Sequence, residues 1–206
     1  MGINRGFFFE TVRMRLFAGK LSAGQVERMT AILDLWEKTR EKQDDRWLAY
    51  MLATAFHETA RTMQPVRETL RGSDDAAIGV LENAFKRGQL PWVSKPYWRK
   101  DDKGRSWLGR GLVQLTHFDN YERMGKELHI NLTTDPAVAM KMDVALQIMF
   151  VGMEKGLFTG FELGQFFDRT KEDWVNARKI INRLDKALQV GDYGKAFYSG
   201  ISYTLG

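Results

Sequence analysis

Apolar residues recur at helical spacing along most of this 206-residue chain. From Ser22 onward they stand three or four positions apart, and Ser22 with Gln25 forms a capping box of the S-x-x-Q type. A second apolar stripe covers residues 47–56 and leads directly into the pair His57-Glu58. The pattern therefore predicts two amphipathic helices, the second of which ends at a histidine and a glutamate.

The same periodicity predicts further helices downstream. They are expected from Ser73 to about Gly88, from about Asn120 to His129, from about Asp143 to Lys155, and along the stripe Tyr193, Phe197, Ile201 and Leu205. Short aromatic stretches around an Asp-Asp-Lys-Gly tetrapeptide, between Tyr97 and Gly111, indicate a small β-hairpin or an irregular excursion. No repeat, low-complexity tract or linker divides the chain. We expect one mainly α-helical domain over residues 1–206 with at most a small hairpin.

Composition and charge narrow the possible chemistry. The absence of cysteine excludes a disulfide scaffold, a thiol nucleophile and a cysteine-ligated zinc site. The net charge of +5 is spread over mixed runs such as residues 37–46 and 99–105, so no nucleic-acid partner is expected. Charges interrupt the N-terminal segment, and the most apolar stretch, residues 146–153, is too short to span a bilayer. We expect a chain that is cytoplasmic when made and does not insert stably into a membrane.

Glu58 is the first candidate for acid/base chemistry. On a helical wheel it falls on the apolar face of its predicted helix, whereas His57 points away from that face. Poorly hydrated surroundings favour the neutral carboxyl, which is the form that can donate a proton to a glycosidic leaving oxygen. The alternative is structural: Glu58 pairs with an arginine such as Arg61 and stabilises the end of the helix.

Glu68 is the nearest downstream candidate for the second carboxylate that glycoside hydrolysis normally needs. Pro65 ends the helical pattern, so Glu68 lies in a loop that can fold back and serve as a general base. If both carboxyl groups act on one bond with inversion, they should be about 6.5–9.5 Å apart. A solvated loop glutamate flanked by Arg67 and Arg71 is an equally good interpretation.

The third candidate is the segment GRGLVQLT at residues 109–116. Glycines on both sides of Arg110 indicate a backbone that closely approaches another group. Gln114 and Thr116, two positions apart, would share one face of an extended strand and line a cleft together. A phosphate-binding loop is excluded, because neither the P-loop nor the dinucleotide glycine spacing occurs.

Other hydrolytic chemistries fit this sequence less well. An H-E-x-x-H zinc motif would need a histidine where Arg61 stands, and His117 and His129 are isolated in sequence. No G-x-S-x-G nucleophile elbow occurs. We therefore expect neither a metal nor a cofactor.

Taken in order, these motifs resemble the glycoside hydrolase family 19 chitinases and their phage endolysin relatives. The resemblance is carried by residues 55–59 (AFHET), 67–69 (RET), 109–116, 117–121 with the pair Asp135-Pro136, and 177–182 (ARKIIN). Together these segments cover the chain from about Trp47 to Phe197. The resemblance implies a lysozyme-like, mostly helical fold with a deep substrate cleft and an inverting mechanism.

The resemblance also implies a role for each matching residue. Glu58 takes the position of the acid, Glu68 that of the base, and Thr116 that of the hydroxyl that holds the attacking water. The implied substrate-binding residues are His57, Arg110, Gln114, Asn120, Tyr121 and Asn182.

Two departures from the family pattern favour peptidoglycan over chitin. Asp119 stands where plant members have an aromatic residue, and Arg183-Leu184 replaces a Gly-Gly pair, both near expected substrate contacts. We expect a monomeric endolysin or lysozyme, without a separate wall-binding domain, that cuts β-1,4 bonds between amino sugars in peptidoglycan. The alternatives are a chitinase acting on chitin oligosaccharides and a non-catalytic glycan-binding module.

The expected location also predicts how such an enzyme would be delivered. Its partner would be the glycan strand of the bacterial cell wall, and its effect would be lysis of the host cell. A phage holin would release it from the host cytoplasm to the periplasmic wall, and a contact-dependent secretion system is the alternative.

Overall fold

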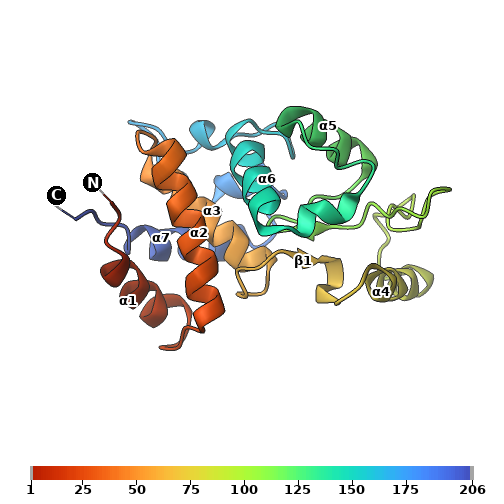
Figure 1. Ribbon diagram of the computed structural model, residues 1–206, viewed down its shortest axis with the longest axis horizontal. Helices are drawn as coiled ribbons and strands as arrows, with labels where there is room; N and C mark the ends of the chain where they lie inside the picture. Colours follow the sequence, from red (N-terminus) through yellow and green to blue (C-terminus); the bar gives the residue numbers. More distant parts are fainter. Residues whose placement is uncertain (1, 205–206) are drawn as a thin grey trace. The chain divides into compact units, whose positions relative to one another are not determined.

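The structure, a computed structural model, describes residues 2–204 and is mostly α-helical (Figure 1). The α-helices of these residues are α1 (Arg5–Leu16), α2 (Ala23–Arg40), α3 (Asp45–Glu58), α4 (Asp74–Lys86), α5 (Phe118–Leu128), α6 (Met142–Glu154) and α7 (Ala187–Tyr198). The short 3-10 helices are η1 (Glu68–Leu70), η2 (Pro136–Met140), η3 (Leu163–Gln165) and η4 (Asn176–Ile180), and the strands are β1 (Val66–Arg67) and β2 (Arg110–Gly111). The predicted mainly helical class is confirmed. None of the described helices has both the length and the apolarity needed to cross a membrane.

The chain divides into two compact units. The terminal unit contains the residues up to Gln64 and those from Met153 onward, whereas the middle unit is the continuous segment Pro65–Gly152. Glu58 therefore belongs to the terminal unit, and Glu68 belongs to the middle unit.

Helix α3 forms the core of the terminal unit, and α7 packs against it. Every residue from Leu48 to Phe56 is buried, so α3 is enclosed rather than amphipathic. Helix α7 approaches this core closely, because a Cβ at Gly194 would lie 2.7 Å from ring atoms of Trp174. The predicted contrast between the last two residues of α3 is wrong: both His57 and Glu58 are half-buried.

The two ends of the described chain lie side by side in the terminal unit (Figure 1). The Asn4 N–H donates to the Ser202 carbonyl at 2.7 Å, and Ile3 forms an antiparallel bridge with Tyr203. This pairing requires extended chain after Tyr198, where α7 ends. The predicted closing helix is therefore displaced from its stripe: α7 begins at Ala187, before Tyr193, Ile201 lies beyond its end, and Leu205 lies outside the described residues.

In the middle unit, α4 contributes Ala77 and Leu81 to a core cluster that also contains Trp98 and Leu108. Strands β1 and β2 pair antiparallel, with Val66 opposite Gly111 and Arg67 opposite Arg110. Because this pairing joins distant segments, it is not the local hairpin that residues 97–111 could have formed.

Residues 101–105 instead form an irregular turn, which was the other predicted possibility. The Asp101 carboxylate accepts hydrogen bonds from the N–H groups of Lys103 at 3.0 Å and Arg105 at 2.9 Å. Its ion pair with the Arg105 side chain, at 2.8 Å, closes the turn. One aspartate thus satisfies the backbone here without a strand partner.

Candidate functional site

Glu68 directly follows β1 and begins η1. Its carboxylate is held on both oxygens: the Tyr97 hydroxyl donates to Oε1 at 2.6 Å, and the Gly109 N–H donates to Oε2 at 2.9 Å. The Glu68 N–H in turn donates to the Gly109 carbonyl at 2.7 Å. Because each oxygen has a fixed donor, Glu68 is a positioned carboxylate and not the freely solvated loop residue of the alternative interpretation.

Tyr97 is a site residue that the sequence did not indicate. Burial raises the pKa of its phenol, and the charge of Glu68 and the hydrogen bond to Glu68 act in the same direction. Tyr97 therefore stays protonated and remains a donor to Glu68 around neutral pH. No local pattern relates a tyrosine to a glutamate 29 positions earlier, so only the fold could reveal this pair.

Backbone strain directly follows Glu68. Thr69 and Leu70 have φ values of 64° and 57°, in a region that costs a residue with a Cβ about 1–2 kcal/mol. Strained positions of this kind cluster at functional sites, where the surrounding structure holds them. The strain supports a functional interpretation of Glu68.

Residues 109–116 form a tight loop rather than the predicted extended strand. Arg110 and Leu115 pair as an antiparallel bridge, and the chain turns between them. Gln114 lies in this turn with a φ of 57°, and its side-chain amide donates to the Val66 carbonyl at 3.0 Å. The prediction that Gln114 and Thr116 share a strand face is therefore wrong.

The turn nevertheless brings predicted site residues together around Gly109. A Cβ at Gly109 would lie 2.8 Å from Gln114 Oε1 and 3.1 Å from Thr116 Cγ2, which confirms the predicted close approach. The Asn120 side chain donates to the Thr116 carbonyl at 2.9 Å. We call this set the Glu68 cluster; it consists of Glu68, Tyr97, Gly109, Gln114, Thr116 and Asn120.

Replacing Gly109 with alanine should disturb this cluster. The added methyl group meets Gln114, which cannot move freely because it holds Val66, so we expect a loss of about 1–3 kcal/mol in the free energy of unfolding. Gly79 in α4 is the matched control, since a Cβ there meets nothing within 4 Å. Gly79→Ala should instead stabilise the protein by about 0.5–1 kcal/mol. Urea unfolding of both variants measures the two changes, and equal effects would contradict the close packing at Gly109.

Arg110 and Tyr121, two of the predicted substrate contacts, are fully buried. The Arg110 guanidinium donates to the Ser106 carbonyl at 3.0 Å and to the Tyr121 hydroxyl at 2.9 Å. The Tyr121 hydroxyl donates to the Leu108 carbonyl at 2.9 Å, and burial raises the pKa of Tyr121 to about 12. Neither side chain exposes surface to a sugar, so we correct their predicted role to a structural one.

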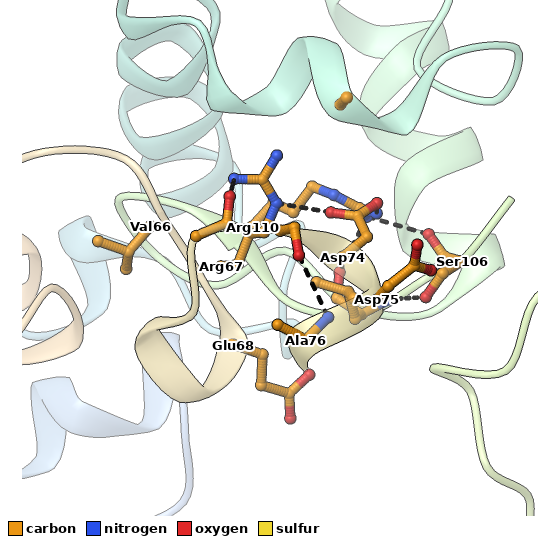
Figure 2. A network of polar contacts seen from close by, with 12 residues as sticks. Val66, Arg67, Glu68, Asp74, Asp75, Ala76, Ser106 and Arg110 are labelled. Carbon is orange, nitrogen blue, oxygen red and sulfur yellow. Dashed lines mark hydrogen bonds and ion pairs between the residues drawn. The ribbon is translucent and has the colours of Figure 1, made fainter. Parts of the chain in front are cut away.

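Asp74 joins Arg110 to Arg67 (Figure 2). Arg67 Nε donates to Asp74 Oδ1 at 2.6 Å, and Arg110 Nη2 forms an ion pair with Asp74 Oδ2. Burial alone would raise the pKa of Asp74, but the hydrogen bonds and charges of Arg110 and Arg67 outweigh it and lower the pKa. Figure 2 shows the Glu68 side chain pointing away from this network, which therefore supports the β1–β2 pair and leaves Glu68 to its own cluster.

In the terminal unit, Glu58 is bound by an arginine. Arg178 Nη1 donates to Glu58 Oε1 at 2.7 Å, and the side chains of Arg178 and Glu58 are 2% and 17% exposed. The predicted apolar surroundings of Glu58 are therefore wrong, since a buried guanidinium lies against its carboxylate. The pairing with an arginine that the alternative interpretation predicted is present, but the partner is Arg178; the Arg61 guanidinium instead lies over the Phe56 ring, 5.5 Å from its centroid.

Arg178 also binds the loop that carries Asn182. Its Nε donates to the Asp185 carbonyl at 2.9 Å, and its own carbonyl accepts the Asn182 N–H at 3.0 Å. The Asn182 side chain is exposed, and its Oδ1 accepts the Arg183 N–H at 3.0 Å. Two segments with predicted site residues, 57–58 and 182–185, thus meet at one buried arginine that had no predicted role.

His57, beside Glu58, is half-buried near the Tyr193 ring, with 6.5 Å between the ring centroids. Burial lowers the pKa of His57; the charge of Glu58 opposes this shift, and the charge of Arg178 adds to it. The imidazole of the folded protein therefore takes up its proton at a lower pH than an ordinary histidine does.

This shift predicts a pH dependence of stability. In the unfolded chain His57 binds a proton as the pH falls through its ordinary value of about 6.5, whereas in the folded chain it does so only at a lower pH. Stability is therefore lost as the pH falls below that value. We expect the free energy of unfolding to fall less between pH 7 and pH 5 in His57→Gln than in the wild type. Urea unfolding at a series of pH values measures this, and parallel curves would contradict it.

The described residues thus define a mainly helical protein in which both candidate carboxylates are held by donors, Glu68 in the middle unit and Glu58 in the terminal unit. Within residues 2–204, no three metal-ligating side chains are grouped so that they could hold a metal ion. A comparison with protein-family models finds no match for this sequence, and a comparison with curated proteins finds none either. The family resemblance, the roles it implies for residues other than Arg110 and Tyr121, and the predicted separation of the two carboxyl groups therefore stay predictions.

Proposed function

We propose that this protein is a peptidoglycan hydrolase of the lysozyme type, which cuts β-1,4 bonds between amino sugars with inversion. Glu68 carries the proposal, because one donor fixes each of its carboxylate oxygens and because Gln114 and Thr116 lie beside Gly109, which supplies one of those donors. A general base must be held within hydrogen-bond reach of the water that it activates. The Glu68 cluster meets that need with residue types that also bind sugars.

In the proposed reaction, Glu68 removes a proton from a water molecule that Thr116 helps to orient. The water oxygen bonds to the anomeric carbon while the glycosidic bond breaks, through an oxocarbenium-like transition state. Glu58 gives its proton to the leaving oxygen, and solvent then restores both carboxyl groups to their starting forms. The product is a reducing sugar of inverted anomeric configuration.

A pocket beside Tyr97 supports glycan binding next to this cluster. It has a volume of about 330 Å³ and is lined by Trp92, Val93, Ser94, Lys95, Tyr97 and His117. Trp92 is 75% exposed, and an aromatic ring left in solvent can stack on the apolar face of a sugar. Lys95 and His117 can add hydrogen bonds to sugar hydroxyl groups.

The role of Glu58 as proton donor is proposed on the His57-Glu58 motif. Arg178 occupies Oε1 and thereby leaves Oε2 to carry the proton. Substitutions at Glu58 test this role separately from that of Glu68. A lysozyme-like fold with a deep cleft, action as a monomer and delivery by a holin belong to the same proposal.

Fragment analysis with the full-length chain tests the proposed function. Purified peptidoglycan and, in parallel, chitin oligosaccharides are incubated with the protein, and the released fragments are identified by mass spectrometry. We expect new reducing ends from peptidoglycan, with muramic acid at the end if the lysozyme bond is cut and glucosamine if the other bond is cut. Cleavage of chitin alone would make it a chitinase. Binding without any new reducing ends would make it a glycan-binding module.

A further inference from the structure

A second pocket, in the terminal unit, combines cations with exposed apolar surface. It has a volume of about 480 Å³ and is lined by Thr159, Phe161, Lys179, Arg183 and Leu184. Phe161 is 43% exposed and Leu184 is 51% exposed, so the apolar part of the pocket is open to a ligand. All five lining residues belong to one unit, which makes the pocket a complete local feature.

Hydrogen bonds hold the walls of this pocket in place. The Thr159 hydroxyl donates to the Lys179 carbonyl at 2.6 Å and to the Ile180 carbonyl at 3.1 Å, which ties the 159–161 loop to η4. The Asn182 side chain accepts the Arg183 N–H at 3.0 Å. The cation-bearing backbone is therefore fixed before any ligand binds, and a fixed site needs less ordering to bind its ligand.

The two cations of the pocket are available to an anion. Neither Lys179 nor Arg183 forms an ion pair with a carboxylate of the described part of the chain. Asp173 is close enough for the charge of Lys179 to lower the pKa of its carboxyl, but it is held by the Asn176 N–H at 3.0 Å and the Asn176 amide at 2.9 Å. No acidic residue lines the pocket itself.

Leu184 continues this apolar surface into a neighbouring pocket. This neighbouring pocket has a volume of about 530 Å³ and is lined by Val175, Leu184, Lys186, Ala187, Leu188 and Gln189. Leu188 in its wall is 72% exposed, and Lys186 adds another cation. An occupant of the joint surface would therefore be a chain molecule in which carboxylates alternate with small apolar groups.

We infer that this pocket binds the peptide stems of peptidoglycan, with Lys179 and Arg183 on the free stem carboxylates. The stem carries carboxylates and alanine methyl groups, which match the cations and the Phe161–Leu184 surface. Chitin carries neither group, so the pocket would make the enzyme selective for peptidoglycan. The inference rests on the proposed function for its substrate.

The test combines a protein change with a matched substrate change. The double variant Lys179→Gln/Arg183→Gln removes both cations, and carbodiimide-mediated amidation of purified peptidoglycan neutralises the stem carboxylates while keeping the glycan strands. For the wild type we expect kcat/KM to fall about tenfold on amidation, since charge-assisted hydrogen bonds of this kind typically contribute that much. The double variant should cleave both substrates at the lower rate that the wild type shows on amidated peptidoglycan, so its loss relative to the wild type should appear on native peptidoglycan alone. Arg15→Gln/Lys38→Gln, which removes two exposed cations elsewhere in the same unit, should behave as the wild type.

The outcomes separate this inference from the proposed function. Equal wild-type rates on native and amidated peptidoglycan would overturn the stem pocket and leave the hydrolase intact. A loss in the double variant, relative to the wild type, that is equally large on both substrates would do the same. If the wild type cleaves neither substrate, calorimetric titration with a soluble tetrapeptide stem still decides the inference. Binding that is weakened about tenfold in the double variant would support it, and absence of wild-type binding would overturn it.

Discussion

Glu58→Gln should release reducing ends from peptidoglycan at least about 100-fold more slowly than the wild type, because an amide cannot donate the proton that a general acid supplies. Glu27→Gln is the matched control, since Glu27 is an exposed glutamate of the same unit. The amide also leaves the Arg178 guanidinium, 2% exposed, without its anionic partner. Circular dichroism and urea unfolding must therefore accompany the rate measurement.

A second substitution separates loss of chemistry from loss of folding. Glu58→Asp keeps the negative charge for Arg178 but moves the carboxyl by one methylene, so the fold should be retained while the rate falls. Full activity of a folded Glu58→Gln protein would reject the assigned role. Activity lost only in proportion to unfolded protein would make Glu58 a purely structural partner of Arg178.

Chemical rescue distinguishes the roles of the two carboxylates. Azide can replace the activated water when a general base is missing, so it should restore turnover in Glu68→Ala and yield a glycosyl azide. A substrate with a good leaving group needs no proton donor, so it should restore turnover in Glu58→Ala. The opposite pattern of rescue would exchange the two assignments.

The second large effect is expected at Asp74. Asp74→Asn leaves the fully buried Arg110 without its anionic partner and should lower the free energy of unfolding by about 3 kcal/mol. The neighbouring Asp75→Asn is the control: the Asp75 side chain is 79% exposed and pairs with Lys100 at the surface. Its change should stay within about 0.5 kcal/mol.

Acid titration checks the same ion pair independently. Because the folded-state pKa of Asp74 lies below its ordinary value, its contribution is present above about pH 4 and is lost as the pH falls through the folded pKa. Urea unfolding followed by tryptophan fluorescence should show a smaller acid-induced loss in Asp74→Asn than in Asp75→Asn. If both variants have equal stability at neutral pH, the Arg67–Asp74–Arg110 network contributes nothing to the fold.

Helices α2 to α6 could be predicted because their signals are local, whereas α1 and the bounds of α7 were not predicted. The Ser22–Gln25 capping box is present with both of its hydrogen bonds, and α5 ends where His129 adopts a left-handed conformation, φ 54°. The same local logic failed for α3, since burial on all sides depends on what packs around a helix and not on its own pattern. The strand predicted from the spacing of Gln114 and Thr116 was wrong for a similar reason. A positive φ at Gln114 closes a turn there, and the spacing of side chains does not indicate such a turn.

The candidate residues were partly predictable, but their surroundings were not. The glycine pattern correctly indicated a close approach at Gly109, and Glu68 was identified as a second carboxylate. The sequence placed Glu58 in apolar surroundings, whereas the structure places a buried cation against it. Arg110 differs in the opposite way: its position in the motif predicts substrate binding, but its side chain is fully buried in the protein.

The sequence by itself determined where helices α2 to α6 lie and which side chains could perform acid/base chemistry. Helix formation depends on residues three or four positions apart, so it is written in the local pattern. The tertiary structure alone decided the partners of those side chains: Tyr97 for Glu68, Arg178 for Glu58 and Asp74 for Arg110, pairs separated by 29, 120 and 36 positions. Such pairs form only when packing brings distant segments together, and they set the charge and geometry on which chemistry depends.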